Sequence, residues 1–584
     1  MLQPIFLFYI CWMKKILTLL VFSFSVLTVS AQDYNPNRYR ESLFPDVLTI
    51  PDVLYGSSPQ WIWPYWDEDL YLDVYVPDGD DNPKRPLIIF AHSGGFINGS
   101  KNVDDMVAIC DSFARKGYVT ASIAYRKGFD PLDSESAERA AYRGLQDGKA
   151  AVRYFKENAS LYDIDTNYIF FGGMSAGGFI SLNVAYMDKE SERPESTYGG
   201  GLVNDLECLD CAGNDYPHSS EVRAILDFWG GVNDTLIIET GDIPMMIMHG
   251  EHDETVPFVF GHPFGLFTLP ESYGGQPISE RAENIDLYYE FFTSEGSNHM
   301  LDGSDNGTWD DDSPNSFWSD TLLPESTRFL WENMKPNTSL VSDEYVEVCA
   351  PYGIVELTVS PGDDSHFVWD FDEASISFVS GEFTNEVSLE FSEPGDYEIV
   401  ITEFNEILCA GIPVTFYVHV ELVAADFSYA FIEPNYVGFT NLTGDPSLTY
   451  TWTFGDGETS SEFEPNHVYE SIGEYEVTLL AESEIGCQDT SISLVSVLAL
   501  DLLPNSIAAV NMHPNPFSES FTISGNEQLV KMIVMDATGQ LIYEVNLLNS
   551  ISYTVETSTW ANGLYFIQLQ DLNGNIVTKR VVKH

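Results

Sequence analysis

The sequence predicts an α/β domain with a mostly parallel sheet and helices on both faces, followed by small all-β sandwiches. Between about residues 45 and 335, short apolar runs alternate with segments of helical periodicity. This alternation is typical of strand–helix repeats around a parallel sheet. After about residue 338 the helical periodicity disappears, and short alternating strands with Gly, Pro and Asp turns follow.

Length and local composition predict five segments. A chain of 584 residues is long enough for about four domains. Met13 precedes two lysines, an apolar run through Val29 and the small-residue site Ser30-Ala31-Gln32, which is typical of a secretory signal. We predict a signal peptide at 1–31, with 1–12 as an upstream extension, an α/β domain at 32–338, and β-sandwich segments at 340–422, 423–500 and 505–584.

The charge balance limits the classes of partner. The chain has 90 acidic and 26 basic side chains, a formal net charge of −64. Such a surface repels a phosphate backbone, so nucleic acid is excluded as a partner. No stretch after the signal is long and apolar enough to span a bilayer. We expect an exported protein that is otherwise soluble.

The most informative motif is Gly173-x-Ser175-x-Gly177. It directly follows the apolar run 168–171 and directly precedes the apolar segment 179–186, so it forms the turn between a predicted buried strand and a predicted helix. A serine raised on such a turn needs neighbours that are nearly free of side chains, which explains the glycines on both sides. This context favours a nucleophilic serine.

A glycine loop lies upstream of this serine. The apolar run 85–91 predicts a buried strand, and it ends in His92-Ser-Gly-Gly95. Such a loop can aim backbone N–H groups at the oxyanion that develops during acyl transfer. The donors precede the nucleophile, as expected of a loop that faces it across one sheet.

A carboxylate and a histidine follow two later strands. Asp253 comes just after the strand predicted at 244–250, and His299 comes just after the strand predicted at 285–292. Open α/β sheets keep their sites at the carboxyl ends of their strands. The chain order Ser175, Asp253, His299 therefore predicts one site for all three.

These motifs resemble those of α/β-hydrolases of the carboxylesterase and lipase type. The resemblance covers about residues 45–335 and rests on the His-x-Gly-Gly-Phe loop, on the Gly-x-Ser-Ala-Gly-Gly turn, and on the segments 71–77, 121–126 and 146–147. It implies the α/β-hydrolase fold and hydrolysis of carboxylic esters by a serine.

The resemblance also implies an oxyanion hole. Its donors would be the backbone N–H of Gly94 or Gly95, together with that of Ala176. Many of these enzymes have glycine where this chain has Ser93, so the set of donors stays open at this loop.

The chemistry assigns a role to each residue of the predicted site. A serine hydroxyl becomes nucleophilic when a neutral imidazole removes its proton, and the resulting imidazolium needs an anion to hold its tautomer and charge. We assign Ser175 as nucleophile, His299 as general base and then acid, and Asp253 as the group that orients the histidine. No His, Cys and carboxylate spacing fits a zinc site, and we predict neither a metal nor a cofactor.

Several neighbouring residues compete for these roles. Glu251 replaces Asp253 if the loop register differs by two, and Asp227, after the strand predicted at 222–226, is a further stand-in. His249 is interpreted as a hydrogen-bonded structural residue, because it lies at a strand-to-loop turn beside Gly250. His252 is disfavoured because it is adjacent to Asp253 in one loop. Asp147 lies on a helix that faces the sheet and is interpreted as structural support.

Seven cysteines remain to be placed. Export permits disulfides, and Cys11 would leave with the signal. The predicted pairs are Cys349 with Cys409, near the two ends of a strand-rich segment, and Cys208 with Cys211, in an acidic insertion without partner histidines. We expect Cys110 and Cys487 to be free.

One of the later segments resembles the polycystic-kidney-disease (PKD) repeat, an immunoglobulin-like module of surface proteins. The resemblance rests on Tyr450-Thr-Trp-Thr-Phe-Gly-Asp-Gly457 and on the segments 465–469 and 473–479. The 340–422 segment, with similar motifs at 367–371 and 395–400, is similar to a diverged copy. Its aromatic residues are expected in the core, and a sugar-binding surface is the alternative that the sequence leaves open.

The last segment resembles the C-terminal sorting domain of type IX secretion, found in Bacteroidetes. The motifs are His513-Pro-Asn-Pro-Phe517, the turn at 536–540, Asn562-Gly-Leu-Tyr-Phe-Ile567 and the basic end 579–584. This resemblance implies passage through the periplasm, an outer-membrane secretion machinery as partner, and a final place on the cell surface or outside the cell.

The sequence as a whole predicts a secreted serine carboxylesterase for short-chain acyl esters. Acetylated or feruloylated plant or algal polysaccharide is one open substrate class, beside aryl esters, short lipids and polyesters. Two competing functions are a non-catalytic surface-binding protein on a hydrolase scaffold and a serine peptidase.

Overall fold

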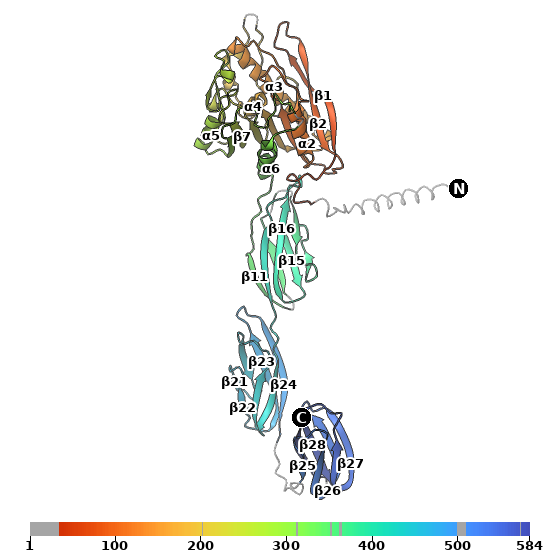
Figure 1. Cartoon of the computed structure of the whole chain (residues 1–584). Coiled ribbons are helices and arrows are strands. Elements are labelled where there is room, and N and C mark those ends of the chain that lie inside the picture. Colours follow the sequence, from red (N-terminus) through yellow and green to blue (C-terminus); the bar gives the residue numbers. More distant parts are fainter. Residues whose placement is uncertain are drawn as a thin grey trace, which may run out of the picture. The chain divides into compact units, whose positions relative to one another are not determined.

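A computed structural model describes residues 34–498 and 510–584, apart from 201–202, 311–312, 351–352, 361, 363–364 and 573. The predicted signal peptide and residues 505–509 of the last predicted segment lie outside the described residues. The chain divides into two compact units at the boundary between Leu422 and Val423. In the described part, all helices lie in the first unit, and the regular elements of the second are strands (Figure 1).

The first unit is built around an eight-stranded sheet with the order β1-β2-β4-β3-β5-β6-β7-β10. β1 pairs antiparallel with β2, and β2 with β4, whereas all the remaining neighbours are parallel. The strands are Val47–Pro59 (β1), Asp67–Pro77 (β2), Arg85–Ala91 (β3), Val119–Ile123 (β4), Ile164–Met174 (β5), Ala224–Phe228 (β6), Met245–Gly250 (β7) and Tyr289–Ser294 (β10).

Helices cover both faces of this sheet, and the strand residues alternate between two cores. In β3, Leu87 and Ile89 pack with buried residues of α3, α4 and α5, whereas Ile88 and Phe90 pack with those of α2 and α6. A strand buried on both faces requires this period of two. The predicted fold class is confirmed. The helices are Asp104–Ala114 (α2), Ser134–Glu157 (α3), Ala176–Tyr186 (α4), Gly275–Asn284 (α5) and Leu323–Glu332 (α6).

Two predicted strand limits are wrong. The strand expected at 285–292 begins only at Tyr289, because α5 ends at Asn284 and the Leu287 N–H donates back to the Ala282 carbonyl at 3.0 Å. Asp227, expected after its strand, lies inside β6. His299 nevertheless follows the carboxyl end of β10, on the same edge as the end of β7.

A β-sandwich completes the first unit. Its two sheets have the orders β11-β17-β16-β13 and β12-β15-β14. The expected core aromatics Phe367 and Trp369 are buried between them. The strands are Tyr345–Cys349 (β11), Ile354–Thr358 (β12), His366–Asp370 (β13), Ile376–Ser380 (β14), Glu386–Phe391 (β15), Gly395–Phe404 (β16) and Val414–Glu421 (β17).

The loop after β16 packs into the α/β domain. The Tyr39 hydroxyl donates to the Ile407 carbonyl at 2.6 Å, and the Trp331 indole N–H donates to the Ala410 carbonyl at 2.9 Å. Ile407 and Cys409 are fully buried in the core that α2 and α6 cover. The sandwich is therefore part of the same packed unit.

The cysteine pairing differs in part from the predicted one. Cys208 and Cys211 form the expected local disulfide, and Cys110 is a buried free thiol as expected. The predicted Cys349–Cys409 pair is wrong, because Cys409 is a free thiol in the loop buried against the α/β domain. Cys487 is disulfide-bonded, not free, and Cys349 is disulfide-bonded as well.

The second unit holds two groups of sheets. The first pairs the orders β18-β19-β22 and β21-β20-β23-β24 around the buried Trp452, and the second is a five-stranded sheet of β25 to β29 around the buried Phe521. The strands are Phe427–Glu433 (β18), Tyr436–Asn441 (β19), Thr449–Thr453 (β20), Thr459–Ser460 (β21), Asn466–Val468 (β22), Gly473–Glu482 (β23), Gln488–Val497 (β24), Asn511–His513 (β25), Ser520–Asp536 (β26), Leu541–Glu556 (β27), Gly563–Asp571 (β28) and Ile576–Lys583 (β29). Of the helices that the structure describes, none is long and apolar enough to cross a membrane.

Candidate active site

Ser175 lies on the sharp turn between β5 and α4, with φ 54° and ψ −112°. This positive φ is rare for a residue with a side chain and marks a locally strained turn. A Cβ atom at Gly173 would lie 2.2 Å from the Gly177 carbonyl oxygen, and one at Gly177 would lie 1.9 Å from the Ala91 carbonyl oxygen. Only glycine fits at either position, so the motif is a requirement of the backbone.

The structure brings Ser175, Asp253 and His299 together. His299 Nε2 lies 2.8 Å from Ser175 Oγ, and His299 Nδ1 lies 2.7 Å from Asp253 Oδ2. Asp253 follows β7 and His299 follows β10, two neighbouring parallel strands. Asn298 Oδ1 accepts from the N–H groups of Glu254 and His299, at 2.9 and 2.8 Å, and so ties the two loops together.

Asp253 is a well-satisfied carboxylate. Its Oδ1 accepts from the N–H groups of Thr255 and Val256, both at 2.8 Å. Burial acts to raise the pKa of Asp253, but hydrogen bonds from His249 and His299 outweigh it, and the pKa falls to about 2. The group is therefore charged at neutral pH and favours the Nδ1–H tautomer of His299, which leaves Nε2 free to accept the serine proton.

His249 is buried directly behind this pair. Its Nδ1 accepts from the Gly275 N–H at 3.2 Å, so the proton is on Nε2, which faces the Val256 carbonyl at 3.1 Å and Asp253 Oδ2 at 3.3 Å. The sequence predicts a structural role for His249 but not this contact with Asp253. The available signal is its position four residues before that carboxylate, at the end of the same strand.

The residues that compete with Asp253 in the sequence do not contact His299. The side chain of Asp227 is fully buried and accepts from the Gly230 N–H at 3.0 Å, and burial raises its pKa to about 7. Glu251 and His252 are exposed on the loop after β7.

Asp147 has the structural role that its helix position predicts. It forms a buried ion pair with Arg126, with a shortest distance of 2.7 Å. One of its carboxylate oxygens also accepts from the Arg126 backbone N–H at 2.7 Å. The pair fixes the loop after β4 on α3.

The predicted oxyanion loop adopts a backbone that requires glycine. Gly94 and Gly95 have φ 121° and 59°. The Gly94 carbonyl accepts from the N–H groups of Ile97 and Asn98, which closes a turn, and Gly95 and Ala176 line the pocket beside Ser175. None of the described residues accepts a hydrogen bond from the Gly95 or Ala176 N–H.

The histidine of this loop is neutral. His92 is fully buried, and burial lowers its pKa to about 3. Its ring stacks on that of Tyr125, with 4.3 Å between the ring centroids. His92 therefore supports the loop from behind and does not compete with His299 as a base.

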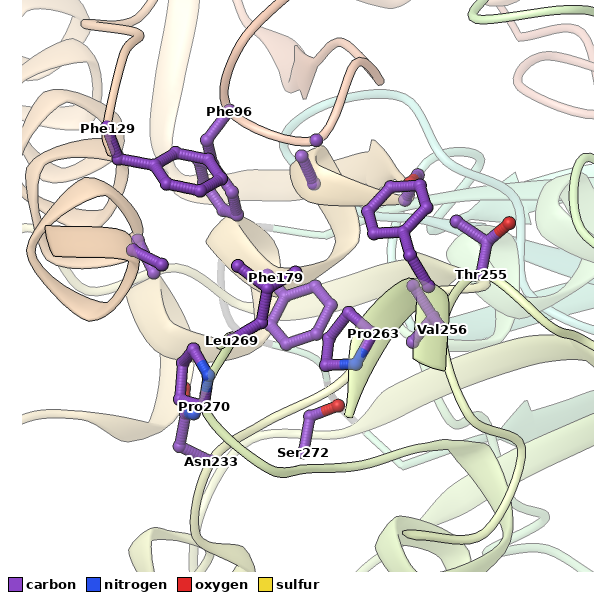
Figure 2. Close-up of a pocket in the computed structure, with 16 residues that line it drawn as sticks. Phe96, Phe129, Phe179, Asn233, Thr255, Val256, Pro263, Leu269, Pro270 and Ser272 are labelled. Atoms are coloured by element: carbon purple, nitrogen blue, oxygen red, sulfur yellow. The ribbon is translucent and has the colours of Figure 1, made fainter. Parts of the chain in front are cut away.

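The pocket beside Ser175 is small and apolar, with a cavity volume of about 70 Å³. Figure 2 shows Phe96, Phe129 and Phe179 along one part of its wall. Another part of the wall comes from the segment between β7 and α5. The lining residues of this segment are Thr255, Val256, Pro263, Phe264, Leu269, Pro270 and Ser272.

The segment that covers the pocket follows Asp253 in the chain, at 255–272. It has no motif that predicts this position from the sequence. Phe264 packs toward the oxyanion loop, because a Cβ atom at Gly95 would lie 3.5 Å from its ring. The Thr268 hydroxyl donates to the Pro131 carbonyl at 2.6 Å and links the segment to the loop before α3.

Three family models match separate parts of the chain. Residues 72–237 match BD-FAE, residues 434–497 match the PKD domain, and residues 511–583 match the secretion system C-terminal sorting domain. The chain contains a domain of each of these families. The predicted resemblances to an α/β-hydrolase, a PKD domain and a type IX sorting domain are confirmed.

Relatives of known activity match only a limited part of the chain. The phenmedipham hydrolase of Pseudarthrobacter oxydans is 34% identical over 118 residues, 20% of this chain and 23% of its own length. Gut esterase 1 of Caenorhabditis briggsae is 34% identical over 115 residues, 19% of this chain and 20% of its own. The chain thus spans about a fifth of the length of these curated relatives.

Solved structures similar to this chain include the apo form of Thermogutta terrifontis esterase 2. It is 20% identical, with a TM-score of 0.35, and the match covers 51% of this chain and 100% of that one.

Within the part of the chain that the structure describes, no three His, Cys, Asp or Glu side chains are grouped to hold a metal ion.

Proposed function

We propose that this chain is a secreted serine carboxylesterase that hydrolyses short-chain acyl esters. The observation that carries the proposal is the hydrogen-bonded line from Asp253 through His299 to Ser175, with distances of 2.7 and 2.8 Å. The line ends on a serine that a glycine-flanked turn presents to a pocket. These are the parts that acyl transfer requires.

In the proposed reaction, Ser175 Oγ attacks the ester carbonyl carbon while His299 Nε2 takes its proton. The bond from carbon to the alcohol oxygen then breaks, and the alcohol leaves with the proton from His299. Water attacks the carbonyl carbon of the acyl group on Ser175 while His299 takes a proton from that water. The bond from this carbon to Ser175 Oγ then breaks, His299 returns the proton to Oγ, and the acid is released. The charged Asp253 stabilises the imidazolium that forms in each half.

Backbone N–H groups are proposed to stabilise the negative charge that develops on the carbonyl oxygen of the ester. The Gly95 and Ala176 N–H groups adjoin Ser175 in the pocket and have no acceptor among the described residues. Donors fixed before the reaction stabilise an oxyanion without reorganisation. Of the three predicted donors we propose these two, while Gly94 shapes the loop through the turn that its carbonyl closes.

The size of the pocket supports short acyl groups. Its volume of about 70 Å³ is roughly half of the ~150 Å³ that holds a benzene ring in an engineered cavity. Phe96, Phe179 and Leu269 are among the large apolar side chains that line it. Acetyl and propionyl groups fit this volume better than long chains.

The sorting domain indicates export to the cell surface or outside the cell, in line with the predicted partner, an outer-membrane secretion machinery. An esterase placed there meets polymers that cannot enter the cell. Acetylated polysaccharide is therefore the substrate class we propose to test first, because a feruloyl group is larger than the benzene ring that already exceeds the pocket volume.

A panel of p-nitrophenyl esters with rising acyl length tests the activity. We expect turnover to be highest for acetate or propionate, and Ser175→Ala to lose several powers of ten in kcat. Circular dichroism of the variant serves as the control for folding. Wild-type protein that hydrolyses no ester would point to a non-catalytic scaffold. A variant that keeps most of the turnover would show that Ser175 is not the nucleophile.

Truncation after residue 500 tests the tail. The purified truncated enzyme should keep its turnover, because the site lies wholly in the first unit. In the native host it should accumulate in the periplasm, and mass spectrometry of the mature exported protein should find the peptide 562–580 missing. Normal export of the truncated chain would contradict the sorting role.

A further inference from the structure

The hairpin between β1 and β2 ends in three exposed tryptophans. Trp61, Trp63 and Trp66 are 37%, 74% and 70% exposed. The turn that carries them is closed by the Gln60 N–H donating to the Trp66 carbonyl at 3.0 Å, and by the Tyr65 N–H donating to the Ile62 carbonyl at 2.8 Å. We call Trp61, Trp63 and Trp66 the indole tip.

The indole tip adjoins the pocket of Ser175. Trp61 packs on Gly128, where a Cβ atom would lie 2.0 Å from the indole nitrogen. The Gly128 N–H donates to the Phe96 carbonyl at 2.7 Å, and both Phe96 and the residue after Gly128, Phe129, line the pocket. Gly128 therefore lies between Trp61 and the part of the pocket wall that Phe96 and Phe129 form (Figure 2).

The base of the hairpin is held firmly. Arg126 Nη1 donates to the Pro59 carbonyl at 3.1 Å, and the same guanidinium forms the buried ion pair with Asp147 of α3. The base of the hairpin that carries the indole tip is thus fixed to α3. Side chains of this size are normally buried, and a group of them left exposed marks an interaction site.

The surrounding charges select the class of ligand. The residues directly after the indole tip are Asp67, Glu68 and Asp69, and the chain carries a net charge of −64. These carboxylates repel polyanions and the anionic surface of a bilayer. They accept hydrogen bonds from hydroxyl groups, while indole faces pack on the C–H faces of sugar rings. Flat apolar rings beside acceptors suit an uncharged, polyhydroxylated ligand.

We propose that the indole tip binds sugar rings of a neutral polysaccharide and holds the chain so that an acyl group on it reaches Ser175. This inference rests on the proposed esterase function and specifies its substrate. Trp61 contacts the sugar nearest to the ester, and Trp63 and Trp66 contact the sugars further along the chain.

The test uses the full chain and the double variant Trp63→Ala/Trp66→Ala. For acetate release from acetylated glucomannan, a neutral polymer, kcat/KM should fall at least about tenfold, chiefly through a rise in KM. The reason is that tryptophan is among the residues whose truncation to alanine weakens binding most. Turnover of p-nitrophenyl acetate, which is too small to reach the indole tip, should change less than about twofold. Phe383→Ala removes an exposed aromatic side chain of the first sandwich and serves as the matched control.

Affinity electrophoresis in deacetylated glucomannan separates binding from catalysis. The wild type and Ser175→Ala should be retarded equally, and the double variant should not. Retardation without any esterase turnover would overturn the proposed function but keep the binding site.

Three outcomes would overturn the proposal itself. Equal losses on polymer and small ester would show a structural role for the tryptophans. An unchanged rate on the polymer would show that the indole tip does not hold this substrate. Binding of the wild type, but not of the double variant, to phosphatidylcholine vesicles with no retardation in glucomannan would assign the indole tip to a lipid surface.

Discussion

Two buried carboxylates, Asp253 and Asp227, lie near the carboxyl ends of the adjacent strands β7 and β6, and their pKa values move in opposite directions. Asp253 accepts from two backbone N–H groups and faces His249 and His299, and its pKa falls to about 2. Asp227 accepts from the Gly230 N–H alone, and burial raises its pKa to about 7. Burial by itself neutralises a carboxyl group, whereas hydrogen-bond partners preserve its charge.

The largest effect in this comparison is expected from Asp253→Asn. The amide is close in shape but cannot hold the Nδ1–H tautomer of His299, and such a change costs about 10⁴-fold in kcat. We expect that loss with p-nitrophenyl acetate at neutral pH. Glu251→Gln, two residues away and exposed, is the matched control and should keep nearly full turnover. If Glu251→Gln were the damaging change, the orienting group would move to Glu251.

A smaller effect is expected from His249→Gln. His249 Nε2 lies 3.3 Å from Asp253 Oδ2 and helps to keep that carboxylate in place. Misplacing a catalytic group by about 1 Å can cost up to about 10²-fold. We expect a loss between about 10-fold and 10²-fold in kcat, with a smaller change in KM.

His249→Gln should also weaken the protein in acid. The lowered pKa of Asp253 stabilises the fold above the ordinary range near 3.9, and this stability is lost as the pH falls toward about 2. Without the His249 contact the pKa of Asp253 in the folded protein is higher, so Asp253 contributes less stability at neutral pH and this contribution is fully lost at a higher pH. His252→Gln, on the exposed loop, is the control. Equal acid stability of both variants would contradict the proposed contact.

The parts of the molecule that local chemistry dictates could be predicted from the sequence. Gly173 and Gly177 are required because a Cβ atom at either position collides with backbone, so the turn that carries Ser175 is visible in the sequence. The strand at Arg85–Ala91 is visible because both of its faces are buried, which makes every residue of its centre apolar.

Contacts between distant segments could not be predicted. Asp253 and Glu251 are two residues apart on one loop, and the contact of Asp253 with His299 depends on Asn298, which ties this loop to the one after β10. Cys409 follows a regular strand of the sandwich, and only packing against the α/β domain shows that it is a buried free thiol. The segment at 255–272 has no regular pattern and covers the pocket through tertiary contacts.

The smallest effect on turnover is expected from Asp227→Asn. Asn keeps the acceptor for the Gly230 N–H, and Asp227 has no contact with His299, so kcat should change less than about threefold. The same variant should change the pH dependence of stability. The raised pKa of Asp227 means that the folded protein favours the protonated form. The stability that this proton contributes is fully present below about pH 3.9 and is lost as the pH rises through about 7.

Thermal unfolding from mildly acidic to mildly alkaline pH measures this change. The midpoint of the wild type should fall relative to that of Asp227→Asn as the pH rises, because the amide cannot ionise. A difference of about 1 kcal/mol shifts Tm by roughly 2–4 °C in a domain of 150–250 residues. Asp305→Asn, on an exposed turn, should follow the wild type. Parallel curves of Tm against pH for Asp227→Asn and the wild type would mean that Asp227 stays charged in the folded protein. A large loss of kcat in this variant would instead give Asp227 a role in catalysis with Ser175 and His299.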